Sequence, residues 1–144
     1  MSVMKYQALH SSIMDLGLYI NQFYNDLYSN QKNIMPPGGH MHIFFHVYSY
    51  MYNFLPDLYS TNIFLVLQSF FLIIPSYWIG KYLGKVSAIA YLLYFPLWFN
   101  ILFDFHFEHL AVVFLVGFLI SVRLKVLILA VIFALLLAFV KEIF

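Results

Sequence analysis

Half of residues 61–80 are Phe, Leu or Ile, and the run also contains Gln68, Ser69 and Pro75. About 20 residues of this kind in a helix cross a hydrocarbon core about 30 Å thick, because each residue adds about 1.5 Å. The run is therefore the clearest candidate for a membrane-spanning helix. We expect the chain to be an all-α membrane protein.

The composition of the whole chain agrees with this expectation. Hydrophobic residues make up 64% of the sequence and charged residues 9%, with a mean hydropathy of +0.87, whereas soluble domains carry about 25% charged residues. The net charge is only +1 and there is no basic run, so we expect no nucleic-acid partner, since phosphate binding needs clustered Lys and Arg. Cysteine is absent, which excludes disulfides and thiolate metal sites.

Three further apolar runs follow the first one, and polar or charged turns separate them. We expect about four transmembrane helices, at residues 61–80, 86–103, 109–122 and 125–141. Pro96 lies inside the second run, where a proline most often marks a kink within a bundle. Residues 61–144 are therefore expected to form a transmembrane helical bundle.

The first 60 residues have a different character. After Asp15, apolar residues recur at helical spacing, which predicts an amphipathic helix on the membrane surface over about 16–28, with Asp15 as its N-cap. Residues 36–39, Pro-Pro-Gly-Gly, interrupt any helix. Residues 43–55 are apolar but too short to cross a bilayer unaided, so we interpret them as interfacial or re-entrant.

Charge is divided between the two sides of this arrangement. With four crossings, one side holds the basic turns, which contain Lys81, Lys85, Arg123 and Lys125. That side is cytoplasmic by the positive-inside rule. The other side receives all six acidic residues and all six histidines. Residues 1–60 are therefore expected to form an extracytoplasmic loop with interfacial helices.

Residues 104–109, Asp-Phe-His-Phe-Glu-His, gather ionisable groups between two apolar runs. Near a bilayer each such group is costly unless it is paired or solvated. Asp104, His106 and Glu108 stand at alternate positions, so an extended turn could direct all three to one ion or phosphate. The simpler interpretation is a polar turn at the membrane interface, where the helices reverse.

Four groups of residues resemble, in order, the motifs of one protein family. They are Asp15-Leu16-Gly17-Leu18-Tyr19 with Gln22, then His40, then Asp104-Phe105-His106-Phe107-Glu108, then Lys141-Glu142. In these the chain is similar to the prokaryotic membrane proteins grouped as domain-of-unknown-function family 2079, which resembles the polyprenyl-phosphate-sugar-dependent glycosyltransferases of the C-type fold. The likeness covers an early internal portion of such proteins, so we expect a truncated member. Phe107 departs from the pattern, because a Pro is usual there.

The resemblance implies a multi-pass protein of a prokaryotic plasma membrane that transfers sugar from a polyprenyl phosphate on the extracytoplasmic face. Asp15 would be the catalytic base that takes a proton from the acceptor hydroxyl. The substrate-binding residues would be His40, Asp104, His106, Glu108, Lys141 and Glu142. A divalent cation, Mg²⁺ or Mn²⁺, would be held by Asp15, Asp104 and His106.

Each of these assignments has a structural alternative. Asp15 is equally well explained as a helix N-cap. His40 and His42 are spaced so that two imidazoles could bind Zn²⁺ or Mn²⁺, although interfacial histidines without a metal are commoner. Lys141 stands at the end of an apolar run, where a lysine most often extends its ammonium group to the interface.

A second hypothesis is a non-catalytic membrane module that binds lipid, sugar or a divalent ion, or that scaffolds a partner membrane protein. C-type folds use more spanning helices than 144 residues provide, which favours dependence on a partner chain or a homo-oligomer in the lipid bilayer. Small residues that allow close helix packing are Gly117, Ala111 and the alanine stripe Ala130, Ala134 and Ala138. We expect the stripe to dock another helix.

Overall fold

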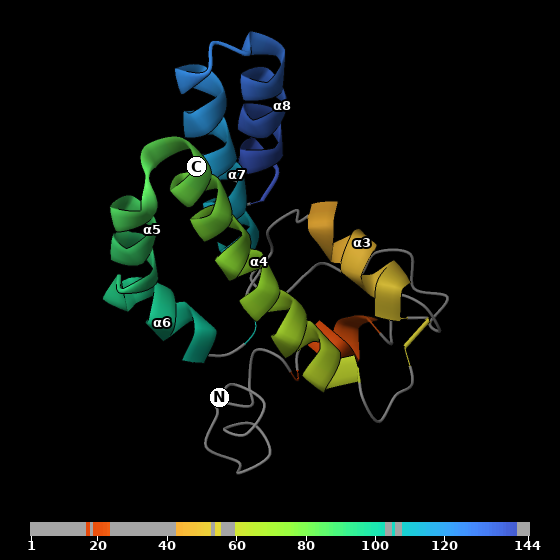
Figure 1. The fold of residues 1–144 in the computed structure, drawn as a ribbon. Helices are drawn as coiled ribbons and strands as arrows, with labels where there is room; N and C mark the ends of the chain where they lie inside the picture. Colours follow the sequence, from red (N-terminus) through yellow and green to blue (C-terminus); the bar gives the residue numbers. More distant parts are fainter. Residues whose placement is uncertain are drawn as a thin grey trace.

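The computed structural model describes residues 17, 19–23, 43–52, 54–55, 60–102, 105 and 108–140. Its labelled helices are α3 (Ile43–Tyr52), α4 (Ser60–Leu83), α5 (Lys85–Leu92), α6 (Phe95–Leu102), α7 (Glu108–Arg123) and α8 (Leu127–Ala138) (Figure 1). Residues 19–23 are also helical. Because this part of the chain contains helices and no strand, the expected all-α architecture is confirmed for it.

Helix α4 runs through the middle of the molecule (Figure 1). Within the described residues, 62–83 is the one helical segment that is both long and apolar enough to cross a membrane. Its 22 residues measure about 33 Å at 1.5 Å per residue, slightly more than a hydrocarbon core of about 30 Å. Pro75 lies inside this helix and is buried. The first expected span is therefore one continuous helix.

The second expected span, residues 86–103, is not one helix. Helix α5 ends at Leu92 and α6 begins at Phe95, so each has only eight residues. Pro96 stands in the first turn of α6, where a missing N–H costs no helical hydrogen bond. The Trp98 indole donates to the Leu92 carbonyl at 2.6 Å across the break. Pro96 therefore starts a helix instead of kinking one.

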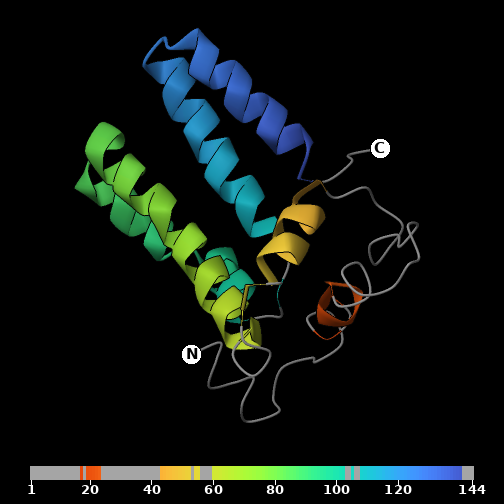
Figure 2. The ribbon, with the colours of Figure 1, turned by 90° about the vertical axis from the view of Figure 1, so that its right-hand side faces the viewer.

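Helices α7 and α8 form an antiparallel hairpin (Figure 2). They have 16 and 12 residues, fewer than the roughly 20 that a perpendicular crossing needs. Lys125 closes the turn with a φ of 60°, and the Val126 N–H donates to the Ser121 carbonyl at 3.0 Å. Four full-length spanning helices are therefore not confirmed by the described residues, and the three later crossings stay a prediction.

The buried core lies where α3, the start of α4 and the start of α7 meet the helical residues 19–23 (Figure 2). We call it the aromatic cluster, and its members are Tyr19, Phe23, Phe45, Tyr48, Tyr52, Phe64, Leu65, Phe105, Leu110 and Val140. In the short N-terminal helix, Tyr19 and Phe23 are buried while Asn21 is exposed. The described residues 19–23 are thus helical with one buried face, which packs on the protein's own core. Their expected position on the membrane surface stays a prediction.

Away from this cluster the helices carry large apolar side chains on their outer surface. Val86 on α5 and Leu127 and Ile128 on α8 are among the most exposed. Extended apolar surface marks contact with a membrane or with another apolar partner. Ala130 of the alanine stripe is buried, whereas Ala134 and Ala138 are exposed beside Leu115 and Phe118. Among the described residues, Ala130 is thus the one alanine of the stripe that is buried, and docking of a further helix on the stripe stays a prediction.

Candidate functional site

The expected site residues divide into one that the structure describes and six that lie outside the described part. Glu108 is half-buried in the first turn of α7, where a carboxylate is stabilised by the positive end of the helix dipole. The residues outside the described part are Asp15, His40, Asp104, His106, Lys141 and Glu142. What the structure does provide is the position of residues close to them in sequence.

Those neighbouring residues meet in the aromatic cluster. Tyr19, four positions after Asp15, contacts Phe105, which follows Asp104, with ring centroids 6.0 Å apart in an edge-on arrangement. Val140, which precedes Lys141, is 2% exposed and belongs to the same cluster. Each of the four groups of family-like residues is therefore close in sequence to a segment that packs in this cluster. For His40 that segment is helix α3, which begins three residues later.

The aromatic cluster is densely packed. Phe23, Phe45, Phe64 and Phe105 each have 0% exposure. The Phe23 ring lies 5.1 Å from Phe45 and 5.6 Å from Phe64, and the Phe64 ring lies 5.7 Å from Phe105. Aromatic pairs at such separations contribute about 0.5–1.5 kcal/mol each beyond their buried area. These contacts fix α3 and residues 19–23 against the bundle.

A buried hydrogen bond links α3 to α7 inside this packing. The Tyr48 hydroxyl lies 2.9 Å from His109 Nε2, and His109 is only 2% exposed. The Phe71 ring of α4 stacks on the His109 imidazole with a centroid distance of 5.7 Å. Burial raises the pKa of Tyr48 above its usual value of 10, so the phenol stays protonated. Its hydroxyl either donates to Nε2 or accepts from it, according to the His109 tautomer.

Two further polar side chains of α3 and α4 are buried. Ser49 on α3 and Gln68 on α4 are buried. Gln68 is one helical turn from Phe64 and Phe71, so it shares their face of α4. We call Tyr48, Ser49, Gln68 and His109 the buried polar group. None of its members was among the residues expected to form the site.

The sequence holds some signal for part of this group. His109 directly follows Glu108 at the start of an apolar run. Burying a polar side chain without a hydrogen bond is unfavourable, so a histidine at this position suggests that it has a partner. Tyr48 carries no such signal, because it is one of 12 tyrosines and lies 61 positions from its partner. Only the fold shows that the two meet.

A metal centre is not formed by the residues whose positions are described. Among them there is no group of three or more His, Asp or Glu side chains that could hold an ion. The expected ligands Asp15, Asp104 and His106 lie outside that part. Binding of Mg²⁺ or Mn²⁺ therefore stays a prediction.

Comparison with protein-family models, with curated proteins and with solved structures gives no match for this chain. The family resemblance therefore depends on the four groups of sequence residues alone. The function has to be inferred from the arrangement of the segments that carry them.

Proposed function

We propose that this chain is a membrane protein whose aromatic-cluster end binds a polyprenyl-phosphate-linked sugar, as part of a glycosyltransferase-like assembly. The observation that carries the proposal is the meeting of four segments in one cluster. Residues 19–23, α3, Phe105 and Val140 pack together there, and each is within a few residues of a group expected to bind or react. A single site at this end of the molecule is the simplest arrangement that uses all four.

The membrane setting of the proposal is supported by α4 and by the distribution of charge. Helix α4 has the length and composition of a crossing. Lys81 and Lys85 flank the α4–α5 turn, and Arg123 and Lys125 flank the α7–α8 turn. Both turns lie at the end of the molecule away from the aromatic cluster (Figure 2). The proposed site is thus at the end opposite the basic turns, which is extracytoplasmic by the positive-inside rule.

The proposed reaction is a displacement at the anomeric carbon of the donor sugar. The acceptor oxygen forms a bond to that carbon, the bond from the carbon to the phosphate oxygen breaks, and the polyprenyl phosphate leaves with the electron pair. Asp15 would take the proton of the acceptor hydroxyl. Lys141 would neutralise the phosphate. We expect residues 1–144 to bind the donor lipid and the rest of the assembly to be needed for transfer.

Binding can be tested with farnesyl phosphate as a short polyprenyl phosphate, with farnesol as the matched compound that lacks the phosphate. A ligand present at 100 times its Kd stabilises the folded state by about 2.7 kcal/mol, so farnesyl phosphate should raise the Tm of the detergent-solubilised chain and farnesol should not. Lys141→Ala should reduce the effect. Lys85→Ala, an exposed lysine at the other end, should keep it.

Two results would count against the proposal. If farnesyl phosphate does not raise the Tm of the unaltered chain, this end does not bind the phosphate. If Lys81→Gln removes the shift while Lys141→Ala keeps it, the ligand binds at the basic end and the proposed site is wrong.

The second candidate, a non-catalytic module, is favoured by one observation. The aromatic cluster is filled by its own side chains, and Tyr48 and His109 satisfy each other within it. Such an interior is typical of a structural core, in which buried polar groups are paired and voids are few. For a purely structural module, neither farnesyl phosphate nor farnesol would change the Tm.

A further inference from the structure

Helix α4 and the α7–α8 hairpin lie side by side (Figure 2). A cavity of about 220 Å³ lies between them near the basic turns. We call this cavity the fork. From α4 it is lined by Tyr77, Trp78, Lys81 and Tyr82. From the hairpin its main apolar residues are Ile120, Leu124, Leu129 and Phe133. It is separate from the aromatic cluster.

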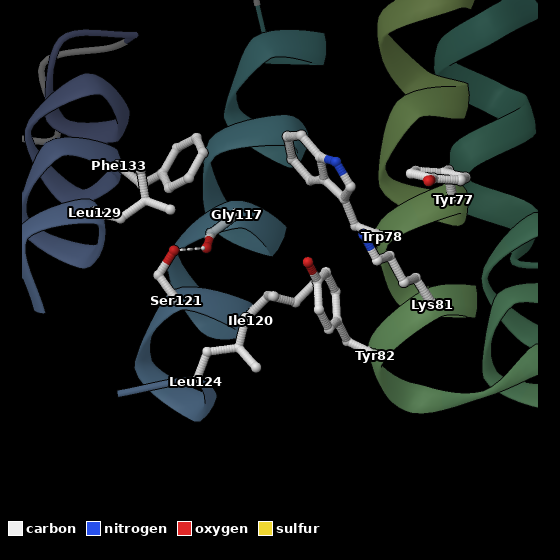
Figure 3. Close-up of a pocket in the computed structure, with 10 residues that line it drawn as sticks. All are labelled: Tyr77, Trp78, Lys81, Tyr82, Gly117, Ile120, Ser121, Leu124, Leu129 and Phe133. Atoms are coloured by element: carbon white, nitrogen blue, oxygen red, sulfur yellow. Dashed lines mark hydrogen bonds between the residues drawn. The ribbon is translucent and has the colours of Figure 1, made fainter. Parts of the chain in front are cut away.

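The inner end of the fork is closed by Phe133. A Cβ atom on Gly117 would lie 2.7 Å from the Phe133 ring, so the ring packs directly on the α7 backbone. The Trp78 ring of α4 meets Phe133 edge-on with centroids 6.0 Å apart. The Ser121 hydroxyl donates to the Gly117 carbonyl at 2.7 Å, which leaves little polarity on this wall (Figure 3).

The outer end of the fork carries a positive charge. Lys81 is exposed there, and its Nζ lies 5.3 Å from the centroid of the Tyr82 ring. Figure 3 shows Lys81, Tyr82 and Leu124 on the side of the fork towards the two turns, with Trp78 and Phe133 further in. The fork is therefore apolar inside and cationic at its outer end. Its interior would match the acyl chain of an anionic phospholipid, and its outer end would match the phosphate.

We propose that the fork binds one anionic phospholipid, with part of an acyl chain between α4 and the hairpin and the phosphate beside Lys81. Tyrosine is enriched at the level of lipid headgroups, and Tyr82 lies beside Lys81 at the outer end. Basic residues at the cytoplasmic surface attract anionic lipids. The fork supplies both within one cavity. This proposal needs α4 to lie in a membrane, but it does not depend on sugar-lipid binding at the opposite end.

The lining of the fork favours a hydrocarbon chain over water. Water needs several polar partners, and an engineered apolar cavity of about 150 Å³ stays dry and takes up benzene instead. A flexible hydrocarbon chain therefore suits this mostly apolar space better than water does.

The chain offers a direct fluorescence test. It has two tryptophans, so Trp98→Phe leaves Trp78 in the fork as the single indole. The Trp98→Phe protein is placed in phosphatidylcholine vesicles. One series of vesicles contains increasing fractions of brominated phosphatidylglycerol, and the other contains increasing fractions of brominated phosphatidylcholine. Bromine quenches an indole that it touches. Brominated phosphatidylglycerol should quench Trp78 as strongly as brominated phosphatidylcholine does at a membrane fraction about five times higher. This factor is the enrichment of an anionic lipid expected from one basic residue at the membrane surface.

Two lysine variants separate the fork from general attraction to the basic end. Lys81→Gln should abolish the preference for phosphatidylglycerol. Lys85→Gln makes the same charge change at the same turn, but this exposed residue does not line the fork, so the preference should remain. Leu129→Phe should fill part of the fork and reduce quenching by both lipids. Unchanged helical circular dichroism in each variant shows that the fold is kept.

Four outcomes would overturn the proposal. The first is equal quenching by the two brominated lipids. The second is an equal loss of preference in Lys81→Gln and Lys85→Gln. The third is removal of the preference by millimolar inorganic phosphate, which would make Lys81 a site for free anions. The fourth is protection of Trp78 that grows with the protein-to-lipid ratio, which would mean that a second copy occupies the fork.

Discussion

Tyr48 and His109 are the residues whose removal should be most informative for the core. The Tyr48 hydroxyl contacts His109 Nε2 at 2.9 Å inside the aromatic cluster, and leaving a buried polar group unsatisfied costs about 1–3 kcal/mol. Tyr48→Phe should lower the free energy of unfolding by that amount, measured by chemical unfolding in detergent. Tyr50→Phe makes the same change on the same helix at a side chain that is 64% exposed. Equal effects of the two changes would show that the buried hydrogen bond contributes nothing.

The same residue predicts a pH dependence. Tyrosines ionise near pH 10 in the unfolded chain, whereas burial holds the pKa of Tyr48 higher in the folded chain. Above pH 10 the unfolded state therefore loses a proton that the folded state keeps, and stability falls by up to about 1.4 kcal/mol per pH unit. Tyr48→Phe should reduce this loss of stability between pH 10 and 12. A parallel pH profile for Tyr48→Phe and the unaltered chain would contradict the assignment.

At the scale of elements, the α7–α8 hairpin depends on a glycine. A Cβ on Gly117 would lie 2.7 Å from the Phe133 ring, whereas a Cβ on Gly80 would meet Ala88 Cβ at an ordinary 3.4 Å. Gly117→Ala should destabilise the protein by about 1–3 kcal/mol through overpacking, reduced by the gain in helix propensity of about 1 kcal/mol. Gly80→Ala should be neutral or stabilising. Thermal unfolding of both variants makes the comparison, and Phe133→Leu in the Gly117→Ala background should restore stability.

The same elements show which parts of the fold can be predicted from sequence. Helices α4, α7 and α8 follow from long apolar runs that end at charged residues. The break between α5 and α6 does not, because Pro96 in an apolar run is equally consistent with a kink and with a helix start. Gly117 is recognisable in the sequence as a small residue in an apolar helix. Its contact with Phe133 depends on how α7 packs against α8, which the sequence pattern does not show.

The candidate site is predictable to a smaller extent than the fold. The order of four residue groups along the sequence suggests that they meet, and the aromatic cluster brings residues near all four together. The buried polar group could not be found in this way, because Tyr48 and His109 are far apart in sequence and Tyr48 lies in a segment rich in aromatic residues. Long-range pairing of this kind depends on tertiary packing, which local periodicity does not encode.

At the scale of the whole molecule, the open question is which end faces the cytoplasm. If α4 crosses the membrane, α3 and the α4–α5 turn lie on opposite sides, and the basic turns are expected to be cytoplasmic. The chain lacks cysteine, so single cysteines can be labelled in intact cells with a membrane-impermeant maleimide. Gly84 is a poor position, because its φ of 97° suits glycine alone. Lys85 and Tyr50 are both exposed and carry the test.

The expected result is labelling of Tyr50→Cys from outside the cell and labelling of Lys85→Cys only after permeabilisation. Each variant is the control for the other, because both side chains are exposed. Tyr50 precedes α4 in the chain and Lys85 follows it, so a crossing by α4 would put them on opposite sides of the membrane. Labelling of both from outside would mean that α4 does not separate them. The reverse pattern would place the basic turns outside, which would move the aromatic cluster to the cytoplasmic face and contradict the proposed extracytoplasmic site.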